Sequence, residues 1–141
     1  MPWLAQPRRP GRLSGWLSAT LDLEVMMELV DHLDELGKAI CEASGALPEP
    51  VRTIVRDLAD RIDFVKRELK KVIDKHYTGE ELEVDVPDRW ASWLVREVIG
   101  IVDRVRALVF EGWVRGARAG QLLGLIRFIE DYLILLPYRG V

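Results

Sequence analysis

Apolar residues recur along this chain in steps of three and four, the spacing that is typical of amphipathic α-helices. Four stretches follow this pattern, and they cover residues 20–43, 51–76, 88–109 and 121–136. Each stretch is long enough for several helical turns and has one apolar face to bury. The pattern therefore predicts an all-α fold, a bundle of about four helices.

Capping residues and helix breakers indicate where these helices begin and end. Ser14 or Ser18 is suited to cap the first helix and Asp88 the third, because such side chains accept hydrogen bonds from free backbone N–H groups. Gly45 is a natural stop for the first helix, and Pro137 ends the fourth. Four helices joined by short connections follow from these signals.

The connection at residues 77–88 has a different pattern, since Leu82, Val84 and Val86 alternate with acidic residues. A period of two is typical of a strand. No second stretch of the chain offers itself as a pairing partner. We therefore expect an ordered, extended linker here.

The first twelve residues are predicted to form an arm. Three prolines and a glycine interrupt regular structure there: Pro2, Pro7, Pro10 and Gly11. The charged side chains of the arm are all basic: Arg8, Arg9 and Arg12. Since 141 residues suit one domain, we expect an arm at residues 1–12 and a single helical-bundle domain at residues 13–141.

Four glycines recur at every fourth position before the last helix: Gly112, Gly116, Gly120 and Gly124. In one interpretation a helix continues through them, and they form a groove that another backbone can approach closely. In the other, this stretch is a loop, because four interior glycines cost a helix about 4 kcal/mol relative to alanine. The spacing favours the helix and the composition favours the loop, so both remain open.

Composition adds a clue to the environment of the protein. The chain has no asparagine, only two glutamines and one cysteine, and fifteen arginines against five lysines. Depletion of thermolabile residues is typical of proteins from hot environments. The single Cys41 excludes an intrachain disulfide, and its apolar neighbours predict a buried side chain.

Neither a secretory signal nor a membrane span is expected. The basic N-terminus has no apolar segment after it. The most apolar stretch, residues 122–136, contains Arg127, Glu130 and Asp131, and it is shorter than the roughly 20 residues that a spanning helix needs. Membrane contact of this last helix without spanning is the most that the sequence predicts.

The net charge of −3 hides a segregation of charge along the chain. Residues 20–43 hold seven acidic side chains and one basic one, whereas residues 51–76 hold eight basic and five acidic ones. The simpler interpretation is that an acidic helix packs beside a basic one. The alternative assigns the basic segments to phosphate, which arginine binds in a bidentate manner.

The candidate nucleic-acid-binding residues are the arginines of two segments: Arg8, Arg9, Arg12, Arg115, Arg118 and Arg127. Three tryptophans lie beside them in the sequence: Trp3, Trp16 and Trp113. Such rings stack on bases or anchor a chain in an apolar neighbour, and we favour the anchor. The candidate interface residues are therefore these tryptophans and the four spaced glycines.

No catalytic, metal-binding or cofactor-binding residues are predicted. Glu28, Asp31 and Glu35 share one helical face with His32, but a di-metal bundle needs Glu-x-x-His pairs, which are absent from the sequence. Glu28-x-x-Asp31 resembles half of the motif of all-helical, magnesium-dependent nucleotide pyrophosphohydrolases. The second half of that motif is missing, since Glu130 and Asp131 are adjacent.

A short helical chain with a proline- and arginine-rich arm and few amides resembles the major capsid proteins of rod-shaped and filamentous archaeal viruses. The resemblance covers the layout of most of the chain and no diagnostic motif. It implies a helical bundle whose N-terminal segment wraps double-stranded DNA, with Arg8, Arg9 and Arg12 against phosphates. It also implies location in the virion, with a cytoplasmic location otherwise.

Long amphipathic helices and five tryptophans supply more apolar surface than one small bundle needs, and surplus apolar surface usually marks an interface. The leading hypothesis is a structural, self-assembling protein without enzymatic activity, with itself or a similar helical subunit as partner and double-stranded DNA as a possible cargo. The alternatives are a non-catalytic adaptor in a protein complex and the nucleotide pyrophosphohydrolase.

Overall fold

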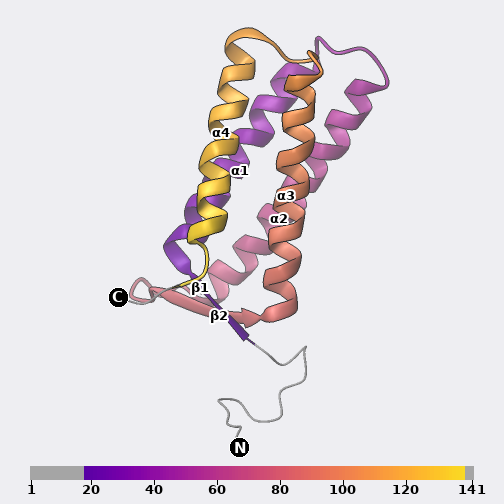
Figure 1. The fold of residues 1–141 in the computed structure, drawn as a ribbon. Helices are drawn as coiled ribbons and strands as arrows, with labels where there is room; N and C mark the ends of the chain where they lie inside the picture. Colours follow the sequence, from indigo (N-terminus) through magenta and orange to yellow (C-terminus); the bar gives the residue numbers. More distant parts are fainter. Residues whose placement is uncertain (1–17, 139–141) are drawn as a thin grey trace, which may run out of the picture.

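The computed structural model describes residues 18–138 (Figure 1). Its elements in chain order are β1 (Ser18–Asp22), α1 (Leu23–Ser44), α2 (Val51–His76), β2 (Glu83–Pro87), α3 (Asp88–Phe110) and α4 (Gly116–Leu135). The helices run alternately up and down, so that α1 packs against α2 and α4, and α3 completes the square opposite α1. The predicted helical bundle is confirmed, and a small sheet is added to it. The predicted arm at residues 1–12 lies outside the described residues.

The sheet closes one end of the bundle (Figure 1). β1 and β2 are antiparallel, with Leu21 opposite Val84, and both of these side chains are buried. On the outer side, Thr20 Oγ1 donates a hydrogen bond to Asp85 Oδ1 at 2.6 Å. The expectation of an unpaired linker is therefore wrong, because the residues just before α1 supply the second strand.

The C-terminal residues bind the other edge of β1. Asp22 N donates to Leu136 O at 2.8 Å, and Tyr138 N donates to Thr20 O at 2.9 Å. Segments from the start, the middle and the end of the described chain thus meet at this end of the bundle. This pairing fixes the N-terminal ends of α1 and α3 and the C-terminal end of α4 relative to one another.

Two predicted caps are corrected by this sheet. The α1 helix begins at Leu23 and is capped by Asp22, whose Oδ1 accepts a hydrogen bond from Val25 N at 3.1 Å. Ser18 instead lies in β1, and Ser14 is outside the described residues. Pro87, not Asp88, holds the N-cap position of α3, because the chain passes directly from the strand into the helix.

The glycine-rich stretch is divided between a turn and a helix. The α3 helix ends at Phe110, and Gly112 and Gly116 have φ angles of +84° and +66°. Glycine adopts this left-handed region without steric cost. The interpretation as a continuous helix is therefore wrong, and a short turn precedes α4, which contains Gly120 and Gly124.

The core is apolar throughout. Within residues 18–138 no polar or charged side chain is buried. The apolar stretch of α4 contributes to this core, since Leu122, Ile126 and Ile129 are buried together with side chains of the other helices.

Cys41 is exposed, so its predicted burial is wrong. It follows the buried Ile40 by 100° around α1, which turns its side chain away from the core. In the described part of the chain, no helix combines the length and apolarity needed to cross a membrane.

Candidate assembly surface

The arginines predicted to bind nucleic acid do not form one surface in the described structure. Arg115 Nε donates to Gly112 O at 2.7 Å, and Arg118 forms an ion pair with Glu42 at 3.2 Å. Arg127 follows Arg118 by nine residues, which places the two on opposite sides of α4. The remaining three lie outside the described residues: Arg8, Arg9 and Arg12.

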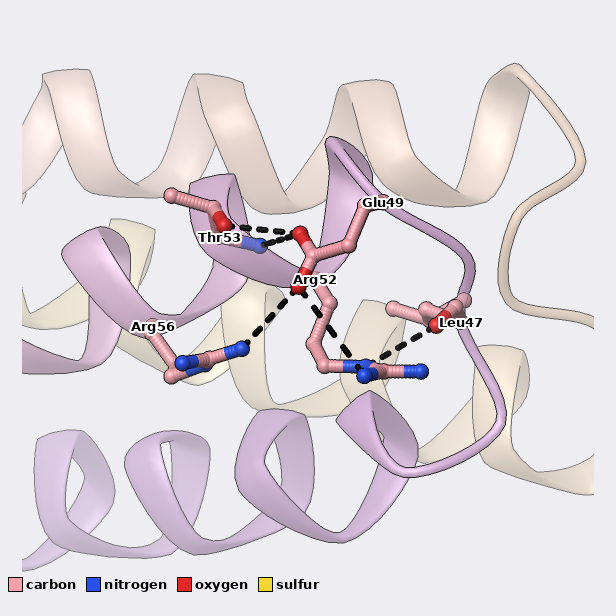
Figure 2. Close-up of polar contacts among 5 residues, drawn as sticks. All are labelled: Leu47, Glu49, Arg52, Thr53 and Arg56. Atoms are coloured by element: carbon pink, nitrogen blue, oxygen red, sulfur yellow. Dashed lines mark hydrogen bonds and ion pairs between the residues drawn. The ribbon is translucent and has the colours of Figure 1, made fainter.

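The first basic residues of α2 hold the preceding loop (Figure 2). Glu49 accepts hydrogen bonds from the backbone N and the Oγ1 of Thr53, at 3.2 and 2.7 Å, and these bonds are the main reason that its pKa is lowered. Arg56 lies 3.1 Å from the same carboxylate, and Arg52 donates to Leu47 O at 3.1 Å. Arg52 and Arg56 therefore connect the first turns of α2 to the loop that precedes it.

The acidic and basic helices also pair directly. Lys66 Nζ on α2 lies 2.6 Å from Asp34 Oδ1 on α1, and Lys38 lies 3.0 Å from the other oxygen. The hydrogen bond from Lys66, followed by that from Lys38, lowers the pKa of Asp34. At this contact the segregated charges are explained by packing between helices.

Three aromatic rings pack together beside the acidic face of α1. The His32 ring lies 5.2 Å from that of Phe128 and 5.0 Å from that of Tyr132. Desolvation, and then the carboxylates of Glu28 and its neighbours, raise the pKa of Tyr132. Over residues 18–138, no three His, Cys, Asp or Glu side chains are placed to hold a metal ion.

The outer boundary between α2 and α3, called the groove below, carries large apolar side chains near both of its ends. At the end nearer the sheet, the Phe64 ring meets Trp93 edge-on at 5.8 Å, and Trp93 lies 6.2 Å from Trp90. At the other end, Ile54 and Trp113 line a cavity of about 230 Å³. The exposed fractions of Ile54, Phe64 and Trp113 are 46%, 47% and 43%. Large apolar side chains thus face solvent at both ends of the groove.

An ion pair crosses the middle of the groove. Arg61 Nη2 on α2 lies 3.0 Å from Glu97 Oε1 on α3. A Cβ built on Gly100 would lie 3.7 Å from that same Nη2, so the guanidinium group lies over the glycine. The groove is therefore divided into an aromatic end and a cavity end by one pair of opposite charges.

Of the predicted interface residues that the structure describes, only Trp113 lines this groove, and Gly112 immediately precedes it. Gly116, Gly120 and Gly124 lie on α4, and an added Cβ at any of them would meet nothing within 4 Å. Trp3 and Trp16 are outside the described residues.

Most residues of the groove are not among those predicted from the sequence to form an interface. The apolar spacing places Trp90, Trp93 and Ile54 on the buried faces of their helices, whereas the structure leaves them at the surface or half-buried. The exposed position of Phe64 could be predicted from the sequence, because it is the one aromatic residue in residues 51–75 and lies off the apolar stripe. The Arg61–Glu97 pair could not be predicted from the sequence, since it joins residues 36 positions apart on two different helices.

Comparisons with known protein families, with curated proteins and with solved structures gave no match. The resemblance to archaeal virus capsid proteins stays a prediction. Inferences about function therefore depend on the surfaces described above.

Proposed function

We propose that this chain is a structural protein that assembles with copies of itself, and that the groove between α2 and α3 is an assembly surface. The observation that carries the proposal is the exposure of large apolar side chains at both ends of this groove, Ile54, Phe64 and Trp113. Aromatic side chains dominate the energetics of interfaces when they become buried. Single exposed apolar residues need no explanation, whereas apolar side chains that lie together do, as Ile54 and Trp113 do around one cavity.

The polar part of the groove supports the same proposal. Arg61 and Glu97 are already paired, so a partner would cover no unpaired charge in the middle of the surface. Burying a charge without a partner is strongly unfavourable. A paired centre with exposed apolar side chains on both sides of it is therefore compatible with a protein partner.

Double-stranded DNA is proposed as cargo through the arm alone. Arg115 and Arg118 already bind Gly112 O and Glu42, which argues against a basic surface on α4. Arg8, Arg9 and Arg12 are the cations of a segment without acidic residues. Association through the groove and binding of DNA by the arm are separable properties.

Sedimentation velocity of the full chain over a range of concentrations tests the proposal. The wild type is expected to form dimers or larger species, and Phe64→Ser and Trp113→Ser are each expected to shift it towards monomer. Leu82→Ser is the matched control, because Leu82 is 65% exposed but lies outside the groove. If all three variants sediment like the wild type, the groove is not the assembly surface. A wild type that is monomeric at every concentration favours the adaptor alternative.

A further inference from the structure

The charges along the groove alternate in opposite order on its two helices. On α2, the acidic Asp57 precedes the basic Arg61 by four residues, and both share a helical face with Ile54 and Phe64. On α3, the basic Arg104 lies at the end where Asp57 lies, and the acidic Glu97 lies opposite Arg61. Within residues 18–138, Asp57 and Arg104 form no ion pair.

These groups occur in the same order along the two helices of the groove. At a rise of 1.5 Å per residue, Asp57 lies about 6 Å from Arg61, and Arg104 lies about 10 Å from Glu97 in the same direction. In the opposite direction Phe64 and Trp93 each lie about 5 Å from the central pair. Complementary groups therefore follow the same order on the two walls, and the side chain of Arg104 has to span about 4 Å along the helices to reach the level of Asp57.

We infer that two copies pack groove to groove about a two-fold axis that runs parallel to the helices through the Arg61–Glu97 pair. This inference rests on the proposed self-assembly and names the arrangement of its partner. The rotation places α2 of one copy against α3 of the other, with both sheets at the same end. Arg61 then faces Glu97 of the second copy, and Asp57 faces Arg104.

The apolar ends fit the same arrangement. Phe64 of one copy lies against Trp93 of the other, which joins two aromatic clusters into one, and Ile54 lies against the far wall of the second copy's cavity. Aromatic pairs add stabilisation beyond their buried area when the rings meet edge-on or offset. A two-fold interface needs this kind of self-complementarity, because the same patch is used twice.

The other two-fold arrangement is disfavoured by the same charges. An axis that crosses the groove at the level of the Arg61–Glu97 pair would place α2 against α2 and α3 against α3. Arg61 would then face Arg61, and Glu97 would face Glu97. Juxtaposed like charges are strongly unfavourable across an interface, so the parallel arrangement is favoured over this one.

Charge exchange tests the pairing directly. Arg61→Glu and Glu97→Arg each place four like charges at the centre of a homodimer, and each is expected to weaken association at least tenfold. An equimolar mixture restores association, because the Arg61→Glu chain is acidic at both positions and then faces the Glu97→Arg chain, which is basic at both. Lys70→Glu makes the same change in charge on the opposite face of α2, because Lys70 is exposed and follows Arg61 by nine residues, and its mixture with Glu97→Arg should restore nothing.

The possible results separate this inference from the proposed function. Association of both variants at the wild-type level would overturn the inference and leave self-assembly through another surface. Weakened variants that no mixture restores would also overturn it, because the two charges would not face each other. A wild type that does not associate would overturn the proposed function itself. Thermal unfolding of each variant, followed by circular dichroism, separates lost association from lost fold.

The direction of the axis is tested by one spin-label distance. Glu80→Cys in a Cys41→Ser background carries the label at the sheet end of the bundle, on an exposed residue. The parallel arrangement places both labels at the same height along the helices, because both sheets lie at the same end. An axis across the groove separates the labels by more than about 45 Å along the helices, given a rise of 1.5 Å per residue, and such a distance would overturn the inference.

Discussion

Arg61 on α2 reaches across to Glu97 on α3, with Nη2 and Oε1 at 3.0 Å, and its guanidinium group lies over Gly100. Both side chains are partly exposed, so the pair contributes at most about 1 kcal/mol to the stability of one copy. Its position matters more than its strength. It keeps the centre of the groove electrically balanced, and the residue beneath it, Gly100, has no side chain.

Gly100 is expected to separate folding from association. Gly100→Ala raises the free energy of unfolding by roughly 0.5–1 kcal/mol, because alanine favours the helix interior and the added Cβ meets Arg61 only at 3.7 Å. Gly100→Leu displaces the guanidinium group and lowers association. Urea unfolding and sedimentation of the two variants check these outcomes. Loss of association in Gly100→Ala as well would show that the floor of the groove tolerates no added atom.

The glycines of the turn and of α4 are expected to respond with opposite signs. Gly120→Ala and Gly124→Ala each stabilise the fold by up to about 1 kcal/mol, because they lie in a helix with free space around them. Gly112→Ala destabilises it, because the φ of +84° is unfavourable for alanine. Urea unfolding measures all three. If Gly120→Ala abolishes association while it stabilises the fold, α4 belongs to an interface as well.

Acid is expected to weaken the contact between α1 and α2. Hydrogen bonds from Lys66 and Lys38 lower the pKa of Asp34 below its usual 3.8. Since the folded-state pKa is depressed, this stabilisation is fully present above about pH 4 and is lost as the pH falls through the lower folded value. The effect is at most about 1 kcal/mol, because Asp34 is well solvated. Urea midpoints between pH 2 and 6 should fall less steeply with acid for Asp34→Asn than for the wild type; parallel curves would contradict this.

Binding of duplex DNA is expected to depend on the N-terminal arm. Deletion of residues 1–12 removes Arg8, Arg9 and Arg12, and three phosphate contacts correspond to a change of roughly 3 in the slope of log affinity against log salt. Arg118→Gln is the control, because Arg118 already pairs with Glu42. Fluorescence anisotropy at several salt concentrations provides the slopes. An unchanged slope after the deletion would remove the arm from DNA binding.

The helices could be predicted from sequence because each buries a long stripe with a regular period. The sheet could not, because β1 has only five residues and follows the same apolar spacing as the helix that it precedes. Asp22 illustrates the ambiguity. The apolar spacing includes it in the first helix, whereas in the structure it is the last residue of β1 and the N-cap of α1. Four spaced glycines are compatible with either a turn or a helix, and the structure contains both.

The candidate surface is harder to predict than the fold, since it depends on which helices are neighbours. Trp113 can be identified from the sequence alone, whereas the Arg61–Glu97 pair depends on the adjacency of α2 and α3. The sequence suggests phosphate for Arg115 and Arg118 because it does not show internal partners. Both have one in the fold: Gly112 O and Glu42.

Negative-stain electron microscopy of the purified full chain, alone and with duplex DNA, tests self-assembly most directly. The proposed self-assembly predicts dimers or larger regular oligomers for the wild type and their loss in Phe64→Ser. A wild type that stays a uniform monomer at every concentration, with and without DNA, would contradict it.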